Sequence, residues 1–124
     1  MSIGTWVRTE KEWMELFKGS FPENLFLERI ILHGDSAVIS LTASLSGMVI
    51  PERWRLKGYD SVSFDMVVGG VSSLSMEGFY VFGKAEVSVE LPLIRIVTNG
   101  GDVSFLAAAC FLNNIAGFIG DGTV

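Results

Sequence analysis

Residues able to carry out acid–base or metal chemistry are scarce in this chain. Its 124 residues include one histidine, His33, and one cysteine, Cys110. His33 lies where a predicted strand meets a turn, so a solvated turn histidine is a simpler interpretation than the base of a Ser-His-Asp triad. A zinc site needs three or four ligands, mostly nitrogen or sulfur, and one histidine with one cysteine cannot supply them. We therefore predict no catalytic residue and no metal site.

The paired carboxylates do not have the spacing of a glycosidase site, and the paired glycines do not have the pattern of a phosphate-binding loop. Glu86 and Glu90 lie on one face of a predicted strand but about 13 Å apart, at roughly 3.3 Å of rise per residue. Two acids that act on one glycosidic bond lie about 5 to 9.5 Å apart. Gly69-Gly70 and Gly100-Gly101 lack the spacing and the following helix of a phosphate-binding loop, and are interpreted as hairpin turns. We predict that the protein is not an enzyme and holds no cofactor.

Two groups of charged residues are instead candidates for binding a partner. Arg53, Trp54 and Arg55 combine positive charge with an aromatic ring, and Glu86 and Glu90 form an open carboxylate face. The arginine segment could hold a nucleic-acid strand by charge and stacking, or be a surface loop whose tryptophan packs inward. The net charge of −5 disfavours phosphate backbones and suits a basic protein. We predict a protein partner and no nucleic acid.

Length and composition predict one domain over residues 1–124 with a single core. The chain is 49% hydrophobic and 19% charged, so apolar surface can remain for a partner. The longest uncharged run, residues 103–120, contains Ser104, Asn113 and Asn114, which are out of place in a membrane span. The N-terminus lacks the pattern of a signal peptide. We therefore expect a cytoplasmic protein that does not enter membranes.

The predicted elements are one helix followed by strands. Thr9 and Glu12 form a capping box that starts a helix over residues 10–18, with an apolar stripe at Trp13, Leu16 and Phe17. From residue 27 the hydrophobic period changes to two. The predicted strands are 27–33, 37–45, 59–68, 71–79, 85–91, 93–98 and 103–112, followed by a bulge near 113–117.

These elements predict an α+β fold that is mainly antiparallel β-sheet, with about seven strands in hairpins and one N-terminal helix packed on the sheet. The strands follow one another without helical crossovers, which excludes a doubly wound parallel fold. The predicted core includes Ile39, Leu41, Phe64, Met66, Val87 and Val89, and Cys110 is expected to be a buried thiol.

The order of the segments resembles the immunity protein 50 family of bacterial polymorphic toxin systems. The matching segments are the apolar stripe of the helix, Phe21-Pro22, Pro51-Glu52-Arg53-Trp54, residues 59–64 and residues 70–79. The resemblance spans roughly residues 13–119, and departs from the family at Phe79, where a tryptophan is expected. It implies a cytoplasmic protein that binds and neutralises a cognate toxin domain, and it carries over no individual functional residue.

Three functions remain open on the sequence alone. The first is stoichiometric occlusion of a cognate toxin, with Arg53, Trp54, Arg55, Glu86 and Glu90 as candidate contacts. The second is a small-molecule-binding domain, or an unrecognised enzyme, with a pocket between the sheet and the helix. The third is a homo-oligomer built through an uncovered sheet edge.

Overall fold

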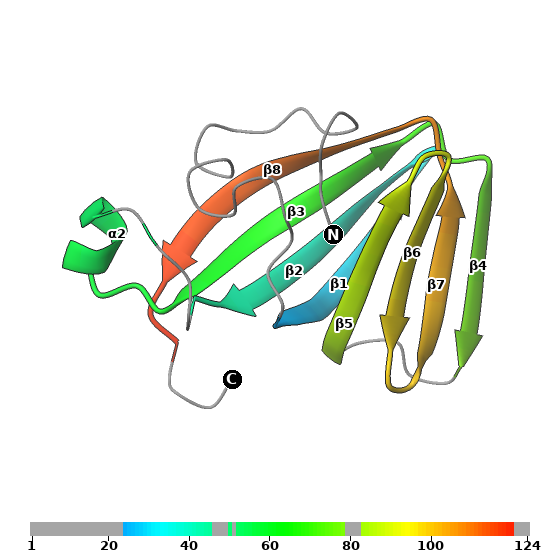
Figure 1. Ribbon diagram of the computed structural model, residues 1–124. Helices are drawn as coiled ribbons and strands as arrows, with labels where there is room; N and C mark the ends of the chain where they lie inside the picture. The colour runs from blue at the N-terminus through cyan, green and yellow to red at the C-terminus, as the bar shows by residue number, and fades with distance from the viewer. Residues whose placement is uncertain (1–23, 46–49, 51, 79–82, 121–124) are drawn as a thin grey trace.

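The computed structural model describes residues 24–45, 50, 52–78 and 83–120. In this part the chain forms eight strands and one short helix (Figure 1). The elements in chain order are β1 (Leu25–His33), β2 (Ser36–Ser44), α2 (Glu52–Leu56), β3 (Ser61–Gly69), β4 (Ser73–Gly78), β5 (Gly83–Glu90), β6 (Leu93–Thr98), β7 (Gly101–Leu106) and β8 (Ala109–Phe118). The helix predicted over residues 10–18 lies outside the described residues.

The strands form one sheet in the order β4-β7-β6-β5-β1-β2-β3-β8. Each strand pair is antiparallel, which confirms the prediction of a mainly antiparallel sheet. The described part contains eight strands where about seven were predicted, because the predicted strand 103–112 is divided into β7 and the start of β8.

The predicted hairpin around Gly34 is confirmed. β1 and β2 pair from Leu25 with Ala43 to His33 with Ser36, and Gly34 takes a φ of 60° in the turn. The Ser36 hydroxyl donates a hydrogen bond of 2.8 Å to the His33 carbonyl oxygen, which satisfies a turn acceptor. The alternating positions predicted to face the core are all buried, namely Ala37, Ile39, Leu41, Ala43 and Leu45.

The prediction that Gly69-Gly70 closes a hairpin is wrong. β3 pairs with β2 and β8, whereas β4 pairs with β7, so the chain changes neighbours at this point. The Ala108 amide donates to the Gly69 carbonyl at 3.0 Å, and the Ser72 amide donates to the Leu106 carbonyl at 2.8 Å. Gly70 has a φ of 64°, and a Cβ there would lie 2.8 Å from the Ala108 Cβ. Two chain segments therefore bend together at a corner.

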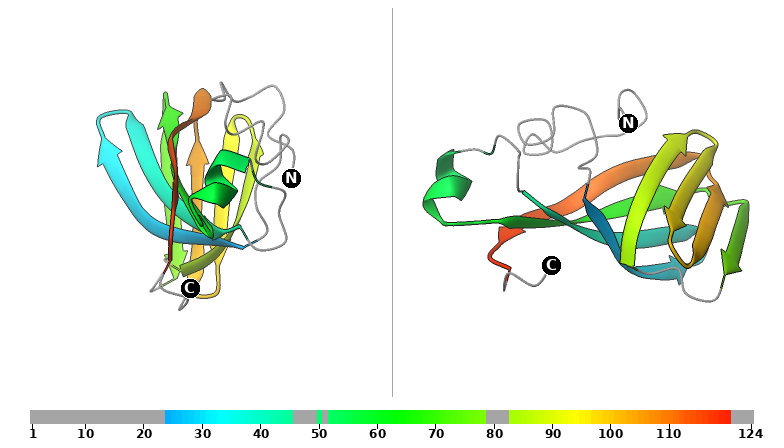
Figure 2. Two further views of the ribbon diagram at one scale, coloured as in Figure 1. Left: turned by 90° about the vertical axis from the view of Figure 1, so that its left-hand side faces the viewer. Right: turned by 60° about the horizontal axis from the view of Figure 1, so that its bottom comes forward.

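This corner curls the sheet, so that its two halves face each other across the core (Figures 1 and 2). Register places the buried side chains of all strands on one face. The most enclosed residues come from both halves and have 0% exposure: Ala37, Ile39, Val62, Met66, Val68, Ile94, Ile96, Val103 and Phe105. The opposite face of the sheet is the outer surface, where a partner can bind.

Candidate functional site

Glu86 and Glu90 lie on the outer face of β5, as the alternation predicted. Both side chains are exposed, and the intervening Val87 and Val89 are buried. The position of the two glutamates on one open face is therefore confirmed, although nothing in the structure tests what they bind.

The pairing register places two further carboxylates in line with Glu86. Glu86 is opposite Val97 on β6, Val97 is opposite Asp102 on β7, and Asp102 is opposite Glu77 on β4. Adjacent strands lie about 4.8 Å apart, so these residues form a row of roughly 14 Å across four strands. We call Glu86, Asp102 and Glu77 the acidic row. Sequence reasoning missed Asp102 and Glu77, because it did not give the strand order.

Cations on this face neutralise the carboxylates only in part. The Arg95 Nη2 donates a hydrogen bond of 2.9 Å to the Asp102 Oδ2, and this bond raises the pKa of Arg95. Among the described residues, no ion pair is formed by Glu77, Glu86 or Glu90. Glu86 and Glu90 are therefore available to a partner's positive charges, whereas Glu77 also lies within electrostatic reach of Arg95.

Exposed apolar side chains lie on the same face, in line with Glu90 and four residues along the strands from the acidic row. Leu93 on β6 is opposite Leu106 on β7, and both are 42% exposed. Val97, within the acidic row, is 39% exposed. The outer surface of β5, β6, β7 and β4, which we call the acidic face, thus combines apolar area with carboxylates. A shallow depression of about 450 Å³ lies at its end, lined by Glu77, Asp102 and the β6–β7 turn.

The predicted arginine segment is a short helix, α2, and not a loop. Arg53 and Arg55 are exposed on it, whereas Trp54 is 5% exposed and belongs to the core. The Trp54 and Tyr59 rings meet edge to face with centroids 5.6 Å apart. A Cβ at Gly117 would lie 2.9 Å from Trp54 Cε3, so glycine leaves the space that the indole occupies. Trp54 packs inward, which leaves the two arginines as the outward part of this patch.

The two candidate patches are far apart. α2 lies beyond the ends of β3 and β8, while β5, β6, β7 and β4 form the opposite end of the molecule (Figure 1). One small partner loop cannot contact both patches, so Arg53 and Arg55 are not part of the acidic face.

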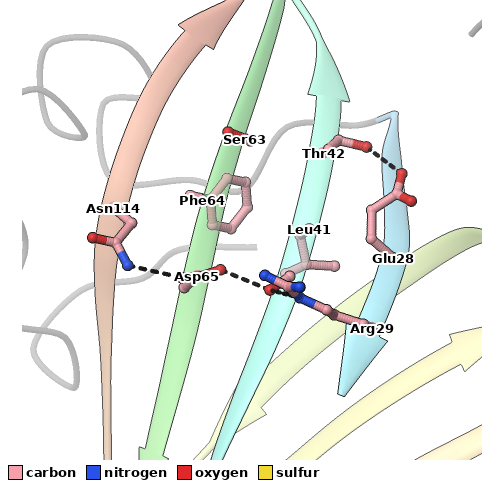
Figure 3. Close-up of a pocket in the computed structure, with 9 residues that line it drawn as sticks. Glu28, Arg29, Leu41, Thr42, Ser63, Phe64, Asp65 and Asn114 are labelled. Atoms are coloured by element: carbon pink, nitrogen blue, oxygen red, sulfur yellow. Dashed lines mark hydrogen bonds between the residues drawn. The ribbon is translucent and has the colours of Figure 1, made fainter. Parts of the chain in front are cut away.

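The outer face of the other half of the sheet carries a polar groove of about 520 Å³ (Figure 3). Asp65 on β3 is its centre. Its Oδ1 accepts a hydrogen bond of 2.8 Å from the Ser40 hydroxyl, and its Oδ2 accepts one of 2.9 Å from Asn114 Nδ2. Arg29 Nε in turn donates to the Ser40 oxygen at 3.3 Å. The network spans β1, β2, β3 and β8.

Irregular strand positions direct polar groups into this groove. The β1–β2 register shifts between Leu27 and Arg29, which places Glu28 where it accepts a hydrogen bond of 2.9 Å from Thr42. Asn114 has a φ of 53°, and the β3–β8 register shifts beside it, which confirms the predicted bulge. Sequence reasoning missed the groove because Ser40, Asp65 and Asn114 are 25 and 49 residues apart along the chain.

The single cysteine, Cys110, lies in the core, and the single histidine, His33, lies at the surface. Cys110 is 2% exposed, as predicted, and burial raises the pKa of its thiol from the ordinary value of 9.0 to about 12. His33 is exposed at the end of β1, which fits the turn histidine. The described residues contain no group of three or more His, Cys, Asp or Glu side chains placed to hold a metal ion.

We expect Cys110 to resist a thiol reagent in the native protein at pH 8, because the reactive thiolate is disfavoured and access is blocked. The reaction of a chromogenic disulfide with native and denatured protein measures this. Because the folded pKa is raised, stability should be unaffected below about pH 9 and should fall as the pH rises from about 9 towards 12. Rapid labelling of native protein would place Cys110 at the surface.

Comparisons of the chain with protein-family models, with curated proteins and with solved structures found no match. The family resemblance therefore rests only on the segments quoted above. In the part of the chain that the structure describes, no helix has the length and apolar character needed to cross a membrane.

Proposed function

We propose that this chain is an immunity protein that binds a cognate bacterial toxin in the cytoplasm and neutralises it by stoichiometric occlusion. The observation that carries the proposal is one outer sheet face with the acidic row towards one end of β6 and β7 and the exposed Leu93 and Leu106, in line with Glu90, at the other end. The resemblance to the immunity protein 50 family supports the same function. On this proposal the toxin presents a basic surface to the acidic face.

The acidic face has the composition of a protein interface. Such interfaces combine an apolar centre with a polar rim and cover about 800 Å² on each partner. Here Leu93 and Leu106 supply apolar area in line with Glu90, and Val97 supplies more between Glu86 and Asp102. The Arg95–Ser104 pair lies between these two groups. The depression beside Glu77 and Asp102 can receive a lysine or arginine side chain. Rigid, paired strands hold these groups in place, which lowers the entropic cost of binding.

The proposed function is tested by co-expressing this chain with the toxin domain encoded beside it. Growth should be restored, and the purified pair should form a complex with equal numbers of both chains. A toxin that remains fully active, together with no complex at micromolar concentrations, would overturn the proposal.

We expect the replacement of Glu86 and Glu90 together by lysine to slow association with the toxin about tenfold or more at low salt. Long-range attraction to a basic partner sets the association rate, and it is screened over about 10 Å at 0.1 M salt. The difference from wild type should therefore shrink as salt rises. Stability should change by no more than about 0.5 kcal/mol, because both side chains are exposed. Stopped-flow association rates at two salt concentrations measure the effect.

A matched control changes the same net charge elsewhere. Glu28 and Glu52 are exposed and lie on β1 and α2, away from the acidic face. Replacing both by lysine should slow association much less. Equal slowing by the two double variants would assign the effect to net charge alone and remove the acidic face from the interface.

A second candidate function is binding of a small polar ligand in the groove around Asp65. Arg29 uses Nε for Ser40, and among the described residues its two terminal nitrogens have no partner. The groove lies on the outer sheet face, and the pocket predicted between the sheet and the N-terminal helix involves residues outside the described ones. Small polar compounds that shift the amide resonances of the groove residues, with no rescue by co-expression, would favour this function.

A further inference from the structure

The edge strand β4 has few of the features that protect a sheet edge. β4 is the last of the described strands in the sheet, and Figure 1 shows no labelled element beyond it. An edge strand has unpaired amide and carbonyl groups, which proteins usually protect with lysine, proline or a bulge. The sequence of β4, Ser-Leu-Ser-Met-Glu-Gly, has no lysine or proline and a single charge, at Glu77, and its register with β7 is unbroken.

The inward-facing side of β4 also leaves apolar area exposed. Leu74 and Met76 are opposite the buried Phe105 and Val103 of β7, so they point towards the core side of the sheet. Leu74 is partly buried, but Met76 is 52% exposed, and β4 has no outer neighbour among the described strands. A further strand added to this edge would cover Met76.

We propose that two copies of this chain associate through antiparallel pairing of their β4 strands, with Ser75 at the two-fold axis. The pairing joins the two sheets into one continuous sheet. Symmetric dimers use the same patch on both copies, so the patch must be complementary to itself. This inference does not depend on the proposed toxin binding.

The sequence of β4 is self-complementary in this register. With Ser75 opposite the Ser75 of the second copy, Leu74 of each copy is opposite Met76 of the other, giving two apolar cross-strand pairs. Glu77 is opposite Ser73 of the other copy, so the two carboxylates do not face each other. Six residues also match the usual length of a strand, about 5–6 residues.

The other sheet edge, β8, is less suited to a second copy. The bulge at Asn114, with its φ of 53°, interrupts the strand. Bulges at an edge disfavour pairing with another chain, whereas β4 pairs with β7 without a register shift. Pairing through β4 adds strands in the plane of the sheet, so it leaves the acidic face open on both copies.

The test combines the oligomeric state with a cross-link at the two-fold axis. Sedimentation equilibrium from about 5 μM to 1 mM should show a reversible dimer, a range suited to a small interface. Higher salt should strengthen it, because each copy carries a net charge of −5. Ser75→Cys should form a disulfide-linked dimer under mild oxidation. Ser88→Cys is the matched control, since Ser88 lies in the same cross-strand row but on β5, inside the sheet.

Substitution at Met76 separates this interface from any other. Met76→Asp should weaken the dimer at least tenfold, whereas Leu56→Asp, the same change at a residue 79% exposed on α2, should leave it intact. Met76→Leu keeps an apolar side chain at this position and should leave the dimer as tight as in the wild type. A monomer over the whole concentration range would overturn the proposal and leave the edge for a strand of another protein. A dimer that survives Met76→Asp and does not cross-link through Ser75→Cys would also overturn it.

Discussion

Replacing Phe105 by alanine is expected to lower the free energy of unfolding by about 3–5 kcal/mol, the usual cost of removing a buried aromatic ring. Phe105 is on β7, opposite Ile94 of β6 and Leu74 of β4, and its exposure is 0%. The ring lies where the two halves of the curled sheet face each other, so the strands around it cannot move inward to fill the cavity without breaking their ladders. Urea denaturation followed by circular dichroism measures the loss.

The neighbouring residue provides the control. Leu106 follows Phe105 on the same strand but points to the outer face, where it is 42% exposed. Leu106→Ala should cost less than about 1 kcal/mol, since surface changes have small effects. A larger loss for Leu106→Ala than for Phe105→Ala would mean that β7 has the opposite facing, because a slip of one residue exchanges the two faces of a strand.

The facing of each strand could be predicted from sequence because it is a local property. Alternation along residues 37–45 and 85–91 reveals which side chains are buried, and Ile39, Leu41, Val87 and Val89 are indeed in the core. The predicted position of Glu86 and Glu90 on one open face follows from the same period of two. No knowledge of neighbouring strands was needed for these conclusions.

Strand neighbours are a non-local property, and the prediction was wrong where it depended on them. A Gly-Gly pair between two strands has the same local pattern whether it closes a hairpin or turns a corner. At Gly69-Gly70 the outcome depends on contacts with Leu106 and Ala108, more than 30 residues away in the chain. A single sequence without aligned relatives contains no signal for such a pairing.

The missed parts of the candidate site have the same cause. Glu77 and Asp102 join Glu86 only because β7 lies between β4 and β6. The burial of Trp54 has a different cause from the position of the carboxylates, since it depends on the helix α2 and on the space above Gly117. The helix over residues 52–56 could not be predicted from periodicity, because its five residues span little more than one turn.

A methyl group at Gly101 is expected to cost about 1–3 kcal/mol of stability, as overpacking usually does. Gly101 on β7 is opposite Gly78 on β4, and the two backbones approach closely. A Cβ at Gly101 would clash with the Glu77 carbonyl oxygen and would lie 3.0 Å from the Gly78 Cα. These atoms belong to the backbone, so they cannot rotate away as a flexible side chain could. Thermal and urea denaturation of Gly101→Ala measures the cost.

Gly69 is the matched control for Gly101, since it is also a sheet glycine, but a Cβ there would have no atom within 4 Å beyond its own chain neighbours. Gly69→Ala should be neutral or stabilise by about 0.4–1 kcal/mol, because alanine restricts the unfolded chain. Equal effects of the two substitutions would contradict the close approach of β4 and β7.

The Gly101 substitution also tests whether the spacing of β4 and β7 matters for the acidic row. Glu77 is adjacent to Gly78 and is held opposite Asp102 by the same ladder. Separating the strands at Gly101 would move Glu77 away from Asp102 and break the acidic row at its β4 end. If the chain binds a toxin as proposed, Gly101→Ala should therefore weaken that binding more than Phe105→Ala when both variants are compared under conditions where each is folded. The phenylalanine supports the core and does not set the spacing of the carboxylates.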